Sequence, residues 1–242
     1  MKKIIIIVVL LLMSFSTFAF AKQFYASDFE RDTIGNPPQG WELGFEGKGK
    51  GSVIKDPLNP SNKVFAHSDL AKDQARHDVG GSIWVVGDNK WQDYIIEYDA
   101  YFPEDFYMGS VFRFTDPEKF YLFDRRSAGE LGNFDFWRRQ AAAWTRFGTG
   151  KFDAQPKQWY HFRIVAKGDT FQAYGKEKGD NTPFSNIDPI MEGKDATFPE
   201  GKFGLYGLIY VDNVVIGETE NDLTIAVEPA GKLATTWSAI KQ

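Results

Sequence analysis

Short apolar segments alternate with turn residues along almost the whole chain, and this pattern limits the fold more than any other feature. Examples are "GSIWVV", "DYIIEYDAYF", "KFYLFDRR" and "WYHFRIVAKGD". Clusters of Gly, Asp, Asn and Pro separate them, such as "DPEK" and "KGDNTP". About a dozen strands with turn signals every 8–12 residues predict an all-β, antiparallel β-sandwich or jelly roll. Because neither a repeat nor a linker divides this part, we expect one domain over residues 22–220.

The N-terminus has the pattern of a secretory signal peptide. Lys2 and Lys3 precede the apolar run "IIIIVVLLLMSFSTFAF", and small residues end at Ala21. We expect cleavage after Ala21, so that residues 1–21 are removed and no membrane span remains. The alternative is an uncleaved N-terminal anchor. Export predicts a periplasmic or extracellular protein, and the absence of Cys excludes a lipoprotein and disulfide bonds.

The C-terminal tail, residues 221–242, differs from the strand-rich part. Leu233, Trp237 and Ile240 are spaced as one stripe of a short amphipathic helix. We expect this helix to pack on the sandwich; a contact with a partner or a membrane surface is the alternative. The formal net charge is −5 and there is no sustained basic run, which argues against a nucleic acid as partner.

Strand alternation separates core positions from the opposite faces of the strands. The expected core positions include Tyr94, Ile96, Tyr98, Ala100, Phe102, Phe112, Phe114, Tyr160, Phe162, Ile164 and Ala166. The opposite faces collect carboxylates, guanidinium groups and flat rings. The residues on these opposite faces are Glu97, Asp99, Tyr101, Arg113, Trp137, Arg139 and His161.

Side chains of these types recognise sugars. An aromatic ring stacks on the apolar face of a pyranose, and charged groups hydrogen-bond its hydroxyls. The same residues could instead form cross-strand salt bridges on an outer face of a sheet. The density of Arg and Trp between Arg125 and Arg146 favours a ligand surface.

Four segments carry a resemblance to a known family: "SDFERDTIGNPPQGW", "GSVFRFTDPEKFYLFDRR", "QWYHFRIVAKGDTFQAYGKE" and "GKFGLYGLIYVDNVVIGE". In order and spacing they resemble the concanavalin A-like lectin/glucanase (laminin-G-like) jelly roll. More narrowly, they look like the 3-keto-disaccharide hydrolase-type domain of exported bacterial proteins. The resemblance implies two curved antiparallel sheets, a ligand on the concave face of one, and carbohydrate binding or processing.

Laminarinase-type glucanases of this fold carry Glu-x-Asp-x-x-Glu on one strand. Glu97-Tyr98-Asp99 matches the first half of this motif, but Phe102 occupies the position of its second Glu. Hydrolysis by that mechanism is therefore not expected, although Glu97 and Asp99 could still act as an acid/base pair.

The resemblance also implies a structural Ca²⁺ where the first and last strands meet. The matching residues are Glu30, in "DFE", and Asp212, in "VDNV", with Asp28 as a possible further ligand. Ordinary surface acids are the alternative.

Taken together, the sequence predicts an exported module that binds a glycan or oligosaccharide on a polar and aromatic sheet face. One alternative is a glycoside hydrolase that uses Glu97 and Asp99. The other is a non-catalytic structural or adhesive surface module, whose Arg- and Trp-rich face binds another protein.

Overall fold

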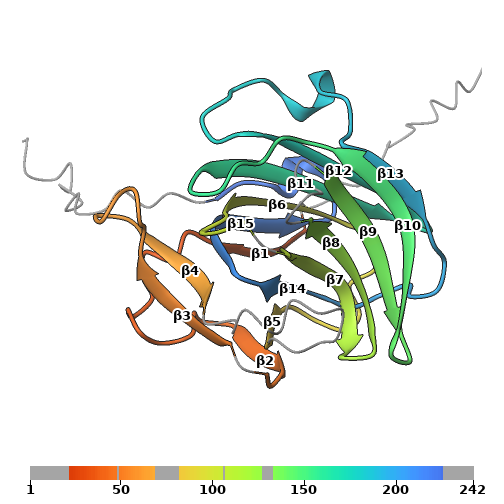
Figure 1. Ribbon diagram of the computed structural model, residues 1–242, viewed down its shortest axis with the longest axis horizontal. Coiled ribbons are helices and arrows are strands. Elements are labelled where there is room, and N and C mark those ends of the chain that lie inside the picture. Colours follow the sequence, from red (N-terminus) through yellow and green to blue (C-terminus); the bar gives the residue numbers. More distant parts are fainter. Residues whose placement is uncertain (1–21, 48, 69–81, 106, 127–132, 226–242) are drawn as a thin grey trace, which may run out of the picture.

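The computed structural model describes residues 22–47, 49–68, 82–105, 107–126 and 133–225. In these ranges the chain forms two antiparallel β-sheets stacked face to face, with only two short 3-10 turns, Phe184–Asn186 and Glu220–Asp222 (Figure 1). The expected all-β sandwich is therefore confirmed. The expected C-terminal helix, with Leu233, Trp237 and Ile240, lies outside the described residues.

One sheet has eight strands in the described part of the chain. Its order is β13-β12-β11-β6-β15-β4-β3, and β1 pairs with β15 beside β4. The strands are β1 (Gln23–Ser27), β3 (Lys50–Lys55), β4 (Lys63–Ser68), β6 (Tyr94–Tyr101), β11 (Trp159–Lys167), β12 (Thr170–Glu177), β13 (Met191–Lys194) and β15 (Ile209–Gly217). The first and last strands are thus hydrogen-bonded neighbours.

The other sheet has seven strands in the order β10-β9-β8-β7-β14-β5-β2. They are β2 (Trp41–Phe45), β5 (Ile83–Val86), β7 (Met108–Asp116), β8 (Lys119–Arg125), β9 (Asn133–Gln140), β10 (Ala143–Lys151) and β14 (Lys202–Gly207). At one side of the sandwich β10 packs beside β13 of the eight-stranded sheet (Figure 1).

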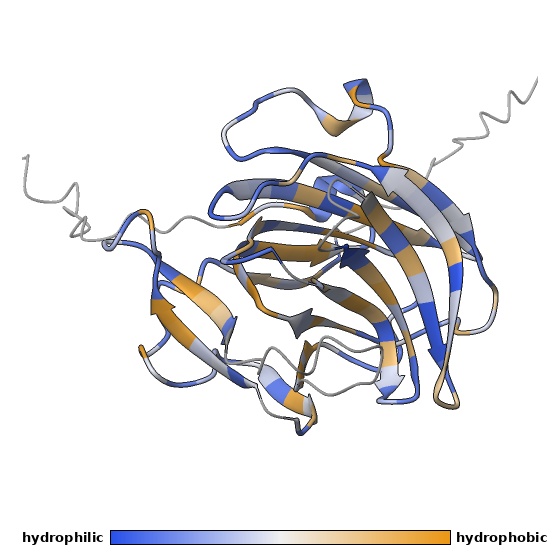
Figure 2. Cartoon of the chain, viewed as in Figure 1, coloured by the Kyte–Doolittle hydropathy of each residue, from blue (hydrophilic) through white to orange (hydrophobic). Residues whose placement is uncertain are grey.

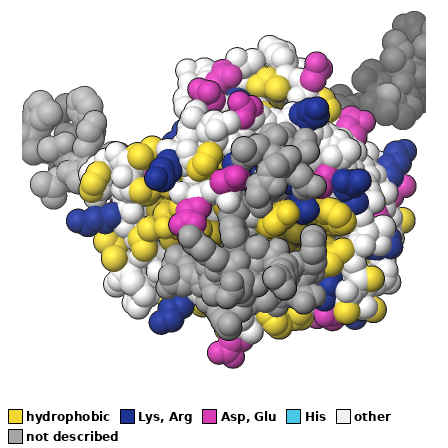
Figure 3. Space-filling model, viewed as in Figure 1, with side chains coloured by type: hydrophobic (Ala, Val, Ile, Leu, Met, Phe, Trp, Pro, Cys, Tyr) yellow, Lys and Arg dark blue, Asp and Glu magenta, His cyan; other side chains and the backbone are white. Residues whose placement is uncertain are grey.

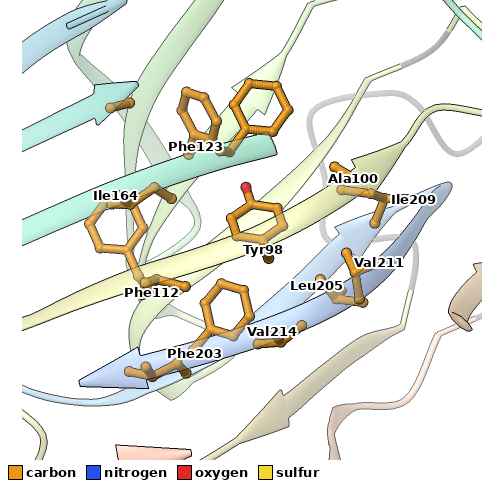
Figure 4. Close-up of a cluster of buried hydrophobic side chains, with 14 of the residues drawn as sticks. Tyr98, Ala100, Phe112, Phe123, Ile164, Phe203, Leu205, Ile209, Val211 and Val214 are labelled. Atoms are coloured by element: carbon orange, nitrogen blue, oxygen red, sulfur yellow. The ribbon is translucent and has the colours of Figure 1, made fainter. Parts of the chain in front are cut away.

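The main core lies between the sheets and is rich in aromatic rings. Hydrophobic and hydrophilic residues alternate along many strands, so that each strand gives one apolar face to this core (Figure 2). Tyr98 of β6 lies among Phe123 and Phe203 of the opposite sheet (Figure 4), and its hydroxyl is 2.9 Å from that of Ser110. The core positions expected on residues 94–102 and 160–166 are confirmed.

Strand β7 departs from the simple alternation. Phe112 and Phe114 were expected on one face, but Phe112 packs in the main core and Phe114 packs on the other side of the sheet. The reason is Arg113, whose φ of 48° produces a bulge and a shift of register against β8. The bulge turns the side chain of Arg113 into the interior, where it is 1% exposed.

The seven-stranded sheet buries apolar side chains on both of its faces. On the face away from the main core, a second cluster consists of Ile83, Val85, Val111, Phe114, Phe120 and Leu122. Phe45, Trp137, Trp144 and Tyr206 pack against this cluster and are only partly buried. We call this side the outer face of the seven-stranded sheet.

Candidate functional site

A cleft opens on the outer face of the seven-stranded sheet. It is partly open to solvent, and its lining residues are Tyr107, Leu122, Asp124, Arg126, Trp137, Trp144 and Tyr206. Figure 3 shows hydrophobic side chains beside Lys and Arg side chains on the face turned to the viewer. Aromatic walls with a few charged groups are typical of ligand sites.

Strand register brings these side chains together. Asp124 of β8 lies opposite Asp135 of β9, and Leu122 lies opposite Trp137. On the other side of β9, Trp137 lies opposite Arg146 of β10. Directly opposed residues of antiparallel strands share a face, so the three strands present one surface.

Arg126 ties the two aspartates together. Its Nη1 donates to Asp124 Oδ2 at 2.7 Å, and its Nε is 3.5 Å from Asp135 Oδ2. The guanidinium also lies 4.3 Å from the ring centroid of Tyr107 and 5.3 Å from that of Trp137. The two rings pack on the guanidinium of Arg126, and the two carboxylates contact its edge. These contacts fix the position of Arg126 in the cleft.

Two buried polar atoms at the cleft have no hydrogen-bond partner among the described residues. They are Asp135 Oδ1 and Trp137 Nε1, an acceptor and a donor two residues apart on one face of β9. Buried polar atoms are normally satisfied. Both atoms are buried from solvent, so a ligand would reach them only if the side chains that cover them moved.

Two residues of the predicted ligand set lie on this face. Trp137 lines the cleft. Arg139 lies opposite Trp144, with its guanidinium 5.1 Å from a ring centroid of that tryptophan, and donates to Ala142 O at 2.7 Å. The structure therefore brings Trp137 and Arg139 together as expected.

Four other residues of the predicted set lie on the opposite side of the molecule. Glu97, Asp99 and Tyr101 of β6 and His161 of β11 are on the outer face of the eight-stranded sheet. His161 Nδ1 is 2.7 Å from Asp99 Oδ1, and its Nε2 is 3.6 Å from Glu97 Oε2. The expected single surface is thus divided between two faces of the sandwich.

The charges of Glu97 and Asp99 are already compensated. Arg163 Nε donates to Glu97 at 2.6 Å, and Lys178 Nζ is 2.9 Å from Asp99. Burial alone would raise the pKa of both carboxyls, but hydrogen bonds with His161 and the nearby Arg163 and Lys178 charges hold both below their usual values. Neither group is therefore a proton donor near neutral pH.

His161 responds in the opposite direction. Burial would lower the pKa of its imidazole, but the bonds with Asp99 and Glu97 outweigh burial and raise it to about 9. The ring also stacks on Phe184, with centroids 5.3 Å apart. These contacts describe an ion network that joins β6 and β11.

Tyr101 and Arg113 have packing roles. Tyr101 is buried against Trp159 and stacks on Tyr210, with centroids 5.6 Å apart. Arg113 donates to the backbone oxygens of Gln92, Gly168 and Phe198. It joins chain segments between the sheets and is not part of the cleft.

The residues expected to bind Ca²⁺ are held by other contacts. Glu30 Oε1 accepts from Lys63 N at 2.7 Å, and Lys63 Nζ donates to the backbone oxygens of Glu30 and Asp32. Asp28 Oδ1 accepts from Glu30 N at 3.2 Å. An ammonium group thus takes the carbonyl oxygens that a cation would use.

Asp212 is held in a similar way. Its Oδ2 accepts from Asn62 at 3.0 Å and is 3.4 Å from Lys178 Nζ. Burial raises the pKa of its carboxyl to about 6. Within the described ranges, no group of three or more His, Cys, Asp or Glu is arranged to hold a metal ion. These contacts do not fit Ca²⁺ at Glu30 and Asp212.

Most residues of the cleft are not among those that the sequence predicts to bind a ligand. The lining residues that were not predicted are Tyr107, Leu122, Asp124, Arg126, Trp144 and Tyr206, and Asp135 and Arg146 lie beside them. The available signal was the density of Arg and Trp between Arg125 and Arg146, together with the shared parity of Asp135, Trp137 and Arg139.

The fold and the cleft place the protein in the class of jelly-roll β-sandwiches with an aromatic cleft on one sheet. No family model matches the chain, and no curated protein matches it. In the part of the chain that the structure describes, no helix has the length and hydrophobicity to cross a bilayer.

The solved structures with similar folds include a carbohydrate-binding module, a domain of an arabinanase and a xylosidase. The carbohydrate-binding module CBM66 from Bacillus subtilis superposes with a TM-score of 0.53 and 17% identity, over 74% of this chain and 95% of that one. Domain 4 of AbnA, a GH43 extracellular arabinanase from Geobacillus stearothermophilus, was solved with arabinotriose. It superposes with a TM-score of 0.52 and 13% identity, over 84% of this chain and 97% of that one.

A xylan beta-1,4-xylosidase from Bacillus halodurans gives a TM-score of 0.54 at 13% identity, over 80% of this chain and 39% of that one. At these identities the likeness is one of fold. It confirms the jelly-roll resemblance, whereas the narrower likeness to 3-keto-disaccharide hydrolase-type domains stays a prediction.

Proposed function

We propose that this protein is an exported carbohydrate-binding module that holds a glycan in the cleft on the outer face of its seven-stranded sheet. The observation that carries the proposal is the combination of Tyr107, Trp137, Trp144 and Tyr206 with the Asp124–Arg126 pair in one cleft. Rings provide stacking surfaces for the apolar faces of sugars, and the charged pair provides acceptors and donors for hydroxyls.

The similar folds give this proposal a second support. One neighbour is a carbohydrate-binding module, and another was solved with arabinotriose. Because fold alone does not fix function, the chemistry of the cleft carries more weight than this likeness.

The hydrolase alternative requires Glu97 and Asp99 to act as an acid/base pair. The contacts of these two residues do not favour that role. General acid catalysis needs a carboxyl that stays protonated near the working pH. Both carboxyls instead have a lowered pKa and lie in an ion network with His161. A purely binding role agrees better with these contacts.

A glycan array tests the proposal. The mature protein is applied beside the variants Trp137→Ala and Trp144→Ala, each checked for its fold by thermal melting. We expect both variants to lose binding by about tenfold or more, because each removes a stacking surface. Asp99→Asn, on the opposite side of the molecule, is the matched control and should bind as the wild type does.

Other results decide between the alternatives. If Asp99→Asn loses binding and the tryptophan variants keep it, the ligand lies on the eight-stranded sheet and the assignment of the site is wrong. If no glycan binds and another protein is retained, the adhesive alternative replaces the proposal. Export is tested separately by N-terminal sequencing of the exported protein, which we expect to begin at Lys22.

A further inference from the structure

Basic side chains lie along the β10 side of the cleft. Arg146 is opposite Trp137, and Thr149 is opposite Asp135. Lys151, two residues beyond Thr149, projects from the same face because side chains alternate along a strand. Arg146 and Lys151 therefore share the face that carries the cleft.

Arg146 is weakly held. Its side chain is 57% exposed, and its Nη1 is 3.8 Å from Asp135 Oδ2, the oxygen that also faces Arg126. The guanidinium lies over the ring of Trp137, 5.8 Å from a ring centroid. Its planar guanidinium is therefore accessible to a second group of a ligand bound at that ring.

Lys151 adds a second accessible positive charge. It is exposed and forms no ion pair with any described residue. The aspartates of the cleft are buried, with side chains 3% and 4% exposed, and both face Arg126. Glu118, a half-buried acid in the turn between β7 and β8, is bonded to Arg139 and to the backbone of Ala142. On the β10 side of the cleft, a ligand would thus meet positive charge.

We propose that the glycan bound here carries an anionic group, the carboxylate of a uronic acid or a sulfate ester, and that Arg146 binds it beside the sugar on Trp137. This inference rests on the proposed function. A guanidinium matches the two oxygens of either group with a pair of parallel hydrogen bonds. Lys151 is roughly 15 Å further along β10 and binds a later anionic unit of an extended chain.

The experiment compares each acidic oligosaccharide with its neutral form. Oligogalacturonates are paired with their methyl esters, and sulfated galactan oligosaccharides with their desulfated forms, so that each pair shares one backbone. We expect the acidic member to bind about fivefold more tightly at low salt, and this preference to shrink as salt is raised. The two pairs distinguish a carboxylate from a sulfate.

Variants assign the preference to its residues. Arg146→Gln should bind the acidic and the neutral form equally, and Arg146→Lys should keep part of the preference. Lys151→Gln should weaken binding of tetramers but not of single sugars. Lys90→Gln removes the same charge at an exposed site, where Lys90 pairs with Glu200 just before β14, and should leave the preference unchanged.

The outcomes separate the two proposals. Equal binding of the acidic and neutral forms, with loss of both in Trp137→Ala, overturns the anionic preference and leaves the carbohydrate-binding function intact. An acidic preference that survives in Arg146→Gln overturns the role of Arg146. Absence of binding to any member of either pair, and to the array as a whole, overturns both proposals.

Discussion

At the scale of single residues, Arg113 stabilises the fold through its guanidinium. It is 1% exposed, donates to three backbone oxygens and lies 3.5 Å from Asp93. Removing such a group leaves these oxygens without their donor; Phe198 O is buried, and an unsatisfied buried acceptor costs about 1–3 kcal/mol.

We therefore expect Arg113→Met to lower the free energy of unfolding by about 3–5 kcal/mol, as measured by urea denaturation. Arg113→Lys keeps the charge but loses the planar guanidinium. Its free energy of unfolding should lie between those of the wild type and Arg113→Met. Glycan binding per folded molecule should not change, since Arg113 is outside the cleft. A variant as stable as the wild type would show that water replaces the guanidinium.

His161 makes stability depend on pH. Its pKa is raised from 6.5 to about 9 in the folded protein, so the protonated ring is bound more strongly than in the unfolded chain. The stabilisation is fully present below pH 6.5 and is lost as the pH rises through 9. We expect a loss on the order of 2 kcal/mol across this range.

The matched variant is His161→Gln, which cannot be protonated. Its unfolding free energy should be nearly flat from pH 6.5 to 9.5, and the two proteins should converge at the alkaline end. Glu97 and Asp99 act in a different range, because their pKa values are lowered: their stabilisation is present above about pH 4.5 and is lost as the pH falls. Equal slopes for wild type and variant above pH 6.5 would contradict the role of His161.

At the scale of strands, the approach of β10 to β13 depends on a glycine. A Cβ at Gly150 would overlap the backbone oxygen of Ile190, just before β13. We expect Gly150→Ala to push the two strands apart and to cost about 1–3 kcal/mol of stability in urea denaturation. Thr149→Ala, at the adjacent exposed residue, should change stability by less than about 0.5 kcal/mol. Equal effects would mean that the sheets do not meet closely here.

Periodicity predicted much of the fold, because regular strands give every second residue to the core. It placed Tyr98 and Phe162 correctly for this reason. It failed at β7, because an arginine with positive φ inserts a bulge that no alternation pattern reveals, and Phe114 changes face. The pairing of strands distant in sequence was also beyond periodicity.

The site was predicted only in part for a related reason. Alternation assigned Trp137 and Glu97 to non-core faces, but a sandwich has two such faces, one on each sheet. Which face a strand supplies depends on which sheet it joins, and this is a long-range property of the topology. The carboxylates of Asp124 and Asp135 became neighbours only through the β8–β9 register.

At the scale of the whole molecule, each outer face has its own chemistry. The eight-stranded sheet carries the Glu97, Asp99 and His161 network, whereas the seven-stranded sheet carries rings around a cleft. The two faces lie on opposite sides of the sandwich, so that substitutions on one can leave the other unaffected.

The contacts of Glu30 bear on metal dependence. Because Lys63 Nζ lies on the carbonyl oxygens of Glu30 and Asp32, we expect EDTA to leave the Tm unchanged. Lys63→Met should lower the Tm by several degrees, as those oxygens lose their donor. A fall in Tm with EDTA, reversed by added Ca²⁺, would instead establish the metal site.

The pairing of β1 with β15 has a mechanical consequence. Gln23 lies opposite Gly217, and Glu218 N donates to the backbone oxygen of Lys22, so the chain enters and leaves the sandwich at one point. A pulling force applied through these two ends would break the β1–β15 hydrogen bonds one after another, as a zipper opens, and not all at once in shear. Traction on the protein would therefore peel β1 away at low force, while the sheet that carries the cleft bears none of the initial load.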